Sequence, residues 1–249
     1  MWEEETLVVV AHPDDEAFFF TPTISKLQRP SLLCLSTGNA YGLGARREKE
    51  FVNACRALGI PKHKITILDA LPDGQSNQWD PLEIAILIEE HLKHSQVRQL
   101  VTFDHMGVSG HPNHVAVFRG VQRLLARGHI HLHAYMLRSE RLHRRFIGPL
   151  AIAVAYISLV LAPLLFAFLS SLPLIIVNHI HSPIPISLTC NDRANECHCA
   201  ANISSWPCHK AMREYETQYV WYRRLHVLFA SVTYCNVLVP FSHRSSEGQ

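Results

Sequence analysis

Residues 7–16 read LVVVAHPDDE, an apolar run that changes abruptly into a cluster of polar residues. The β-branched composition of residues 7–11 predicts a short buried strand of the kind found in parallel sheets. The five residues that follow place one imidazole and three carboxylates directly after that strand. Carboxylates this close together repel one another, and a bound dication is the usual way in which proteins offset the repulsion. An Asp-rich loop that caps the next helix has the same composition, so this stretch alone leaves both interpretations open.

Strand and helix patterns alternate along the chain beyond this stretch. Phe51, Cys55 and Leu58 recur at helical spacing, for example, and Gly59 follows them as a helix terminator. The expected strands are residues 7–11, 31–36, 64–68, 99–103 and 130–137, and the expected helices are residues 23–28, 45–58, 81–94 and 114–126. This alternation predicts a Rossmann-like α/β fold with a mostly parallel sheet and helices on both faces. We expect a single domain over residues 1–249.

A second polar cluster, His111-Pro112-Asn113-His114, follows the fourth expected strand and opens the next helix. In parallel sheets, ligands bind at the carboxyl ends of the strands, near the point where strand order reverses. Two clusters at matching positions therefore favour a shared site. One carboxylate and two imidazoles are the ligand set of catalytic zinc, which keeps one position for water. The remaining acids and imidazole can supply a general base and an oxyanion donor, as hydrolysis of an amide requires.

These two clusters resemble the paired motifs of the PIG-L, or LmbE-like, family of zinc-dependent de-N-acetylases. The first motif is Ala11-His12-Pro13-Asp14-Asp15-Glu16 and the second is His111-Pro112-Asn113-His114. Thr37-Gly38-Asn39 and Val101-Thr102-Phe103-Asp104 are similar to the eukaryotic branch, which acts on N-acetylglucosaminylphosphatidylinositol. The resemblance covers about residues 6–140 and resumes near residues 209–225.

The resemblance implies a role for seven residues. The metal ligands would be His12, Asp15 and His114. Asp14 would be the general base, and His111 would be the cation that stabilises the tetrahedral intermediate. Arg47 and Asn39 would bind the substrate. The implied cofactor is Zn2+, and other divalent metals such as iron or manganese suit the same ligands.

The resemblance also implies a reaction and a place in the cell. The reaction would be hydrolysis of the N-acetyl group of N-acetylglucosaminylphosphatidylinositol to acetate and glucosaminylphosphatidylinositol, the second step of GPI-anchor biosynthesis. It would take place at the cytoplasmic face of the endoplasmic reticulum membrane, with the glycolipid and a membrane surface as partners. The near balance of 23 basic and 21 acidic residues gives no sign of a nucleic-acid surface. Two alternatives are a de-N-acetylase of a soluble N-acetylglucosaminyl compound and a catalytically silent, membrane-associated interaction protein.

Members of the eukaryotic branch usually begin with a membrane-spanning segment, whereas the first expected strand begins here at residue 7. We therefore expect either a shortened form or an internal membrane contact. Residues 146–177, which contain no charged side chain, are the candidate for that contact. Pro163 and Pro173 favour a buried or interfacial element over a membrane span.

The cysteines and the other histidines do not predict a second site. The seven cysteines form no even disulfide framework, which favours a reducing compartment. Residues 178–208 are expected to be an irregular loop, whose metal-ligand residue types are Cys190, Cys197, His198, Cys199 and Cys208, followed by His209. Their spacing fits no standard zinc finger. We expect His129, His131 and His133 to lie on a solvent-facing strand edge.

Overall fold

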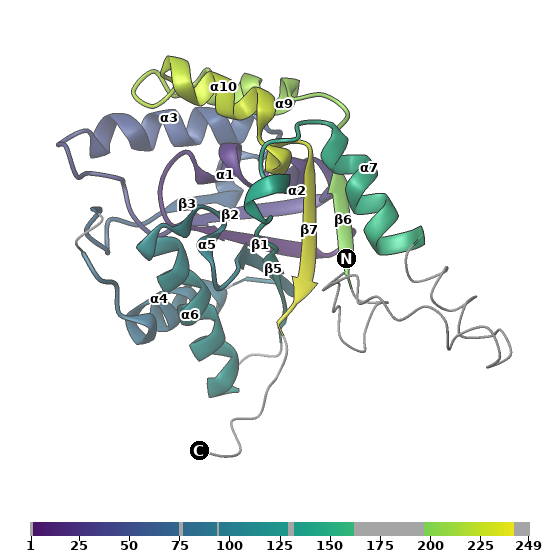
Figure 1. The fold of residues 1–249 in the computed structure, drawn as a ribbon. Helices are drawn as coiled ribbons and strands as arrows, with labels where there is room; N and C mark the ends of the chain where they lie inside the picture. Colours follow the sequence, from purple (N-terminus) through teal and green to yellow (C-terminus); the bar gives the residue numbers. More distant parts are fainter. Residues whose placement is uncertain (1, 75–76, 94, 129–131, 162–196, 242–249) are drawn as a thin grey trace, which may run out of the picture.

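The computed structural model describes residues 2–74, 77–93, 95–128, 132–161 and 197–241. Within these residues, seven strands form one sheet in the order β3-β2-β1-β4-β5-β7-β6 (Figure 1). The strands are β1 (Glu5–Val10), β2 (Arg29–Cys34), β3 (Ile65–Ile67), β4 (Gln99–Phe103), β5 (His133–Leu137), β6 (His198–Ala201) and β7 (Cys235–Pro240). Strands β1 to β5 pair in parallel, and β7 and β6 extend the sheet in antiparallel fashion. The predicted mostly parallel sheet is therefore confirmed.

Strand β1 lies at the centre of the sheet, between β2 and β4. Leu7, Val8, Val9 and Val10 are completely buried, because helices cover the sheet on both sides of this strand. The chain adds β2 and β3 on one side of β1 and then returns to add β4 on the other. Strand order therefore reverses between β1 and β4, and the crevice beyond their carboxyl ends is the expected ligand site.

The helices form a layer on each face of the sheet (Figure 1). Helices α4 (Pro81–Leu92) and α6 (Pro112–Arg127) pack together on one face, and α1 (Asp15–Phe18), α2 (Thr21–Lys26), α3 (Gly44–Ala57) and α9 (Trp206–Met212) cover the other. Gly120 allows α4 and α6 to approach closely, since a Cβ atom there would lie 2.3 Å from Cγ2 of Ile84. Asp80 begins α4 by accepting a hydrogen bond of 2.9 Å from the backbone N–H of Leu82.

The described part of the uncharged segment contains a short helix that packs on the sheet. Helix α7 (Leu150–Tyr156) buries Ala151 and Ala155 against Cys235 and Val237 of β7 and leaves much of its remaining surface exposed. Residues 162–177 lie outside the described residues. In the parts of the chain that are described, no helix has the length and apolar character needed to cross a membrane.

The expected irregular loop is wrong where the structure describes it. Residues 198–201 form the edge strand β6, and α9 begins at Trp206. The local sequence does not indicate this strand, because its pairing partner β7 follows more than thirty residues later. Cys208 contacts the backbone oxygen of Ala17, whereas Cys199 lies beside Cys235, so these two cysteines face different neighbours. Cys190, His129 and His131 lie outside the described residues, and His133 is exposed as expected.

Candidate metal centre and catalytic pocket

The two polar clusters meet at the carboxyl ends of β1 and β4. Residues 12–16 leave β1 and enter α1, while residues 111–114 open α6 after the short helix α5 (Gly107–Gly110). Because β1 and β4 are neighbours, His12 and His114 face each other with ring centroids 5.7 Å apart. The predicted juxtaposition of the clusters is thus present in the fold.

Asp15 presents one carboxylate oxygen to His114. Its Oδ2 accepts hydrogen bonds from the backbone N–H groups of Ala11 (3.1 Å) and His12 (2.9 Å), which leaves Oδ1 at 3.1 Å from Nε2 of His114. Burial opposes ionisation of this side chain, but the adjoining His114 and His12 hold the pKa of Asp15 well below its usual range. The charged carboxylate is therefore already oriented for ligation.

His114 directs its Nε2 toward the same point. Its Nδ1 lies 3.0 Å from the backbone oxygen of Gly107, and in the neutral tautomer that donates to this carbonyl, Nε2 is the nitrogen available to a metal ion. The ring stacks on Phe103 with centroids 4.1 Å apart and planes 6° apart. Gly107 has a φ of 61°, and a Cβ atom on it would lie 2.9 Å from Cβ of His114, so this close carbonyl contact requires glycine.

The separation between these atoms fits a shared metal ion. Two donors held by one zinc ion at about 2.0–2.1 Å in tetrahedral geometry lie roughly 3.3 Å apart. Oδ1 of Asp15 and Nε2 of His114 are 3.1 Å apart, and both residues are almost completely buried. The donor set and its hydrogen-bonded support therefore fit zinc.

His12 completes this arrangement on the other side. Its Nδ1 lies 3.7 Å from Oδ2 of Asp15, and its Nε2 lies 3.1 Å from Oδ1 of Asp73. Burial opposes the charged form of this imidazole, but the two carboxylates prevail and raise the pKa of His12 to about 9. A proton on His12 therefore provides positive charge between carboxylates, where a metal cation would otherwise supply it.

His111 brings a third imidazole to the cluster, and ligand atoms of His12, His111 and His114 lie within 4.8 Å of one another. Nδ1 of His111 accepts a hydrogen bond of 3.2 Å from the backbone N–H of Asn113. In the neutral ring this places the proton on Nε2, which makes Nε2 a donor and not a ligand. The hydrogen bonds therefore favour Asp15 over His111 as the third candidate metal ligand beside His12 and His114.

The family resemblance implies that His111 is a cation, whereas its surroundings in the structure favour the neutral imidazole. Burial, together with the nearby His114 and His12, lowers the pKa of His111 to about 4. The imidazole is consequently neutral at pH 7 in the metal-free protein. Its available chemistry is hydrogen-bond donation from Nε2 to a developing oxyanion, which needs no positive charge on the ring.

Asp14 lies at the entrance to α1 with a φ of 111°, an unusual backbone conformation for a residue with a side chain. Its Oδ2 accepts a hydrogen bond of 2.6 Å from Arg223 and lies 3.6 Å from Nη2 of Arg47. Burial raises the pKa of Asp14, while the two guanidinium groups act in the opposite direction. This carboxylate thus lies beside the candidate metal ligands with its charge balanced by arginine.

Arg47 reaches the pocket as expected, but Asn39 does not. The Arg47 guanidinium donates to the backbone oxygens of Pro13 (2.6 Å) and Gly38 (2.9 Å), joining the loops after β1 and β2. The Asn39 side chain accepts a hydrogen bond of 2.8 Å from the backbone N–H of Gly44, at the start of α3. Asn39 therefore shapes the loop, and it is absent from the described lining of the pocket.

Glu16, the last acid of the first motif, supports the site from beneath. It is completely buried, accepts a hydrogen bond of 2.7 Å from the hydroxyl of Tyr215 and lies 3.2 Å from the backbone N–H of Asp14. Burial raises the pKa of Glu16 to about 8. The acidic motif thus divides into one member beneath the pocket, Glu16, and two members that line it, Asp14 and Asp15.

A pocket of about 640 Å³ opens over these residues. Its floor contains His12, Asp14, Asp15, His111 and His114, and its walls include Arg47, Asp73, Gln218, Tyr222, Arg223 and His226. The last four come from helix α10 (Trp221–Phe229) and the turn before it. The pocket therefore combines residues from both ends of the described chain.

Sequence reasoning missed Asp73 and did not place Arg223 in the site. Asp73 follows β3 within Pro72-Asp73-Gly74, so a polar turn at a third strand's carboxyl end was an available signal. Arg223 lies within residues 209–225, where the family resemblance resumes, but only the packing of α10 over α1 brings it to Asp14.

Comparison with known proteins connects this geometry to a family. The family model described as GlcNAc-PI de-N-acetylase (PIG-L) matches residues 7–125. A probable N-acetylglucosaminyl-phosphatidylinositol de-N-acetylase of Schizosaccharomyces pombe is 39% identical over 152 residues, which cover 58% of this chain and 61% of that protein. The N-acetylglucosaminyl-phosphatidylinositol de-N-acetylase of Bos taurus is 45% identical over 129 residues, covering 49% of this chain and 51% of that protein. The chain thus spans about half to three-fifths of the length of these relatives.

A solved structure extends the likeness of fold to most of the chain. The crystal structure of a triple mutant of a deacetylase from the teicoplanin biosynthetic pathway covers 98% of this chain and 100% of its own, with a TM-score of 0.57 and 11% identity. That similarity shows a shared fold. Residues 7–125 contain both polar motifs and the whole histidine–aspartate cluster, and over these residues the chain matches the PIG-L family model described as GlcNAc-PI de-N-acetylase.

Proposed function

We propose that this protein hydrolyses the N-acetyl group of N-acetylglucosaminylphosphatidylinositol in a zinc-dependent reaction. The products are acetate and glucosaminylphosphatidylinositol. The observation that carries the proposal is the 3.1 Å approach of Asp15 Oδ1 to His114 Nε2, with the opposite atom of each side chain held by backbone groups. Such a prearranged pair, with Asp14 beside it, suits metal-assisted hydrolysis.

His12, Asp15 and His114 would hold the metal ion. When bound, zinc supplies a Lewis acid that lowers the pKa of a water molecule to about 7 and polarises an amide carbonyl. Three protein ligands are also the number that catalytic zinc sites use. His111 is then free to donate its Nε2–H to the carbonyl oxygen as negative charge develops there, a contribution of roughly 3–4 kcal/mol for a well-placed donor.

Asp14 acts as the general base in this proposal. Its carboxylate removes the proton from the attacking water and then delivers that proton to the departing amine. The hydrogen bond from Arg223 keeps Oδ2 oriented and favours the ionised form that can accept a proton. Arg47 and Asp73, which lie 3.5 Å apart on the pocket wall, provide one donor and one acceptor for sugar hydroxyl groups.

The glycolipid substrate places the reaction at a membrane surface. We assign it to the cytoplasmic face of the endoplasmic reticulum, as the second step of GPI-anchor biosynthesis. A pocket that is open and partly polar suits a sugar headgroup, while the lipid tails stay in the membrane. The whole of residues 1–249 would act as one de-N-acetylase domain.

The experiment that tests the function is acetate release from purified substrate, with metal content measured on the same sample. Activity should disappear in Asp14→Asn while zinc is retained, because this change removes the base and not a ligand. His114→Ala should lose both. Equal turnover of a soluble N-acetylglucosaminyl compound that lacks the phosphatidyl group would favour the soluble-substrate alternative. A zinc-loaded protein that hydrolyses neither compound would favour a catalytically silent interaction protein.

A further inference from the structure

Helix α10 carries an apolar stripe on the outside of the protein. Trp221, Leu225 and Phe229 recur every fourth residue and are 72%, 48% and 52% exposed. Val227 is the buried residue of this helix. A surface helix ordinarily turns its apolar stripe toward the core, so α10 has the reverse arrangement.

A second segment continues this surface. Leu142, Phe146 and Leu150 are exposed, and they lie in and beside the stretch that leads into α7. The backbone N–H of Gly148 donates a 2.9 Å hydrogen bond to the backbone oxygen of Phe229, which joins the two segments.

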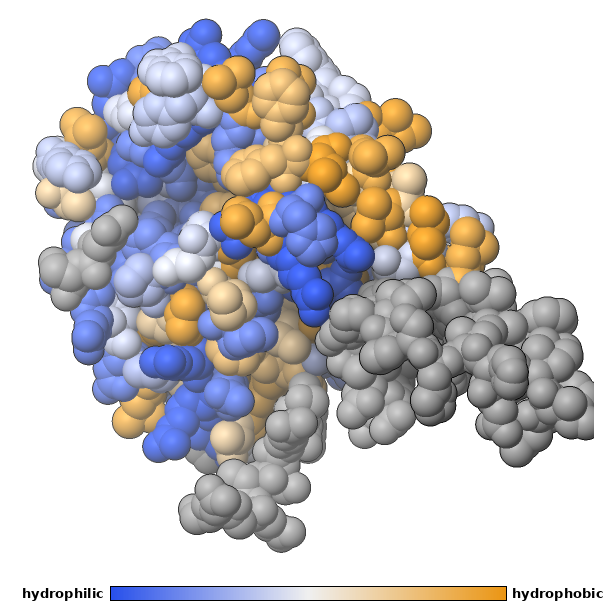
Figure 2. All heavy atoms as spheres, viewed as in Figure 1, coloured by the Kyte–Doolittle hydropathy of each residue, from blue (hydrophilic) through white to orange (hydrophobic). Residues whose placement is uncertain are grey.

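We call Leu142, Phe146, Leu150, Trp221, Leu225 and Phe229 the apolar face. Figure 2 shows hydrophobic side chains gathered over α10, the stretch before α7 and α7 itself. A contiguous exposed apolar surface of this kind marks a site of association in a water-soluble protein.

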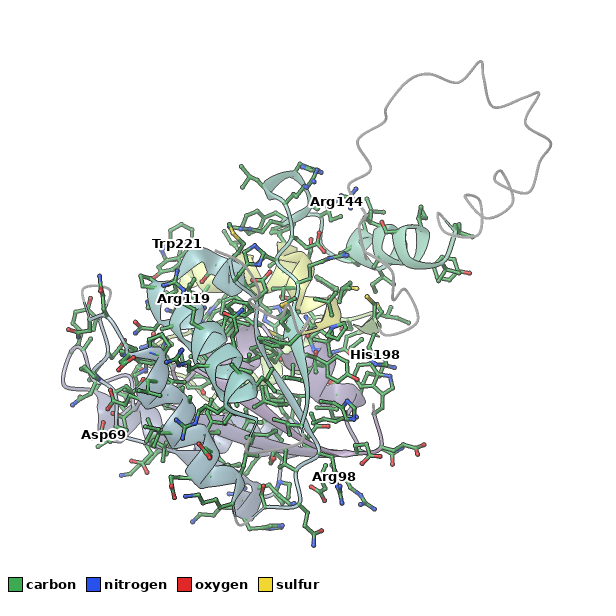
Figure 3. The ribbon with its side chains drawn as sticks, turned by 90° about the horizontal axis from the view of Figure 1, so that it is seen from below. Asp69, Arg98, Arg119, Arg144, His198 and Trp221 are labelled. Carbon is green, nitrogen blue, oxygen red and sulfur yellow. The ribbon has the colours of Figure 1, made fainter. Side chains whose placement is uncertain are left out.

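The charged side chains within the two segments are basic. Outside the catalytic pocket these are Arg141, Arg144, Arg145 and Arg224, and Glu140 beside them is paired with Arg138. Neither residues 141–161 nor residues 217–241 contain an aspartate or glutamate. Figure 3 shows Arg144 and Trp221 toward the same end of the molecule, with Arg98 at the other end. An apolar centre with a basic surround complements a layer of lipid with anionic headgroups.

The apolar face adjoins the catalytic pocket. Tyr222, Arg223 and His226 project from α10 into the pocket wall, while Trp221 and Leu225 of the same helix are exposed outside. A smaller cavity of about 120 Å³ is lined by Phe146 and shares His226 with the catalytic pocket. A surface that contacts the apolar face is therefore next to the pocket mouth.

We propose that the apolar face docks on a membrane containing anionic lipids and so brings the pocket mouth to the headgroup layer. Two copies of this chain are a poorer match, because docking face to face would oppose arginines with arginines. The inference deepens the proposed function, since it specifies how the enzyme reaches a lipid substrate. Membrane binding is nevertheless measured separately, on vesicles that contain no substrate.

The first test removes apolar side chains from α10. Full-length wild-type protein is mixed with vesicles of phosphatidylcholine and phosphatidylserine, and the bound fraction is measured by flotation. Leu225→Ser with Phe229→Ser should weaken partitioning by about tenfold or more, because both side chains would enter the interface. The matched control is Leu82→Ser with Ile86→Ser, an exposed pair at the same spacing on α4, which should bind as wild type does.

The second test removes charge. Arg141→Gln with Arg224→Gln should weaken binding to the anionic vesicles by about 25-fold, since each arginine near such a surface contributes roughly fivefold. Arg119→Gln with Arg123→Gln on α6 removes the same charge away from the apolar face and should leave binding unchanged. Binding should also fall on vesicles of phosphatidylcholine alone and at high salt.

Several outcomes would overturn the docking proposal. Wild-type protein that stays unbound on the anionic vesicles would do so, as would equal binding by the α10 variant and its α4 control. A dimer in sedimentation that the α10 variant abolishes, without vesicle binding, would assign the apolar face to a second copy. Vesicle binding without acetate release would uphold docking and contradict the proposed function. Acetate release from a soluble analogue without vesicle binding would uphold de-N-acetylation and contradict docking.

Discussion

Zinc binding should be strongly pH-dependent, because the ion must displace a proton from His12. Asp15 and Asp73 raise the pKa of His12 to about 9 in the metal-free protein. Only about 1% of His12 is therefore neutral at pH 7, and the apparent affinity for zinc should be about 100-fold below its high-pH limit. Between pH 6 and pH 8 the affinity should rise about tenfold per pH unit.

The assay is isothermal titration of the metal-free protein with zinc, in buffers of different ionisation enthalpy at each pH. About one proton should be released from His12 per zinc bound at pH 7. In Asp73→Asn the pKa of His12 should fall, so that fewer protons are released at pH 8 and the affinity levels off at lower pH. Glu48→Gln removes an exposed carboxylate of α3 and should behave as wild type does. Affinity that is flat from pH 6 to pH 8 in the wild type would refute the reasoning.

The raised pKa of His12 also predicts how the stability of the metal-free protein depends on pH. A histidine whose pKa is higher in the folded than in the unfolded state stabilises the fold below the unfolded value of 6.5. That stabilisation is lost as the pH rises through about 9. Chemical unfolding in the presence of a chelator should therefore show a decline in stability from pH 6.5 to pH 9 that is smaller in His12→Gln.

Three further predictions concern side chains outside the metal ligands. Arg223→Ala should raise the pKa of Asp14 and so move the acid limb of the kcat/KM profile to higher pH; an unchanged limb would contradict the assigned contact. Tyr215→Phe should lower the free energy of unfolding by about 1–3 kcal/mol, because buried Glu16 loses its hydroxyl donor, and equal denaturation midpoints would argue against that bond. Gly120→Ala should destabilise by about 1–2 kcal/mol in thermal unfolding, since a methyl group there lies 2.3 Å from a side-chain carbon of α4; unchanged or increased stability would show that the helices can separate freely.

Local sequence was sufficient for much of the fold and for the centre of the candidate site. The strand at residues 7–11 and the helix at residues 45–58 were predicted within two residues of β1 and α3 at each end, because their apolar spacing reflects direct burial. Strand β4 was predicted with its observed bounds. The two polar clusters were also placed correctly, since parallel strands bring their carboxyl ends to one edge of the sheet.

Tertiary structure decided what local patterns could not encode. Strands β6 and β7 form only because they pair with each other and β7 pairs with β5, so neither shows itself in its own few residues. Arg223 reaches Asp14 across 209 positions of sequence. The sequence by itself identified the candidate residues for metal and base chemistry, because residue type sets what a side chain can ligate or protonate. Packing decided which imidazole nitrogen faces the pocket, which acid lies beneath it and which face of α10 meets solvent, because these depend on neighbours that the chain brings together only on folding.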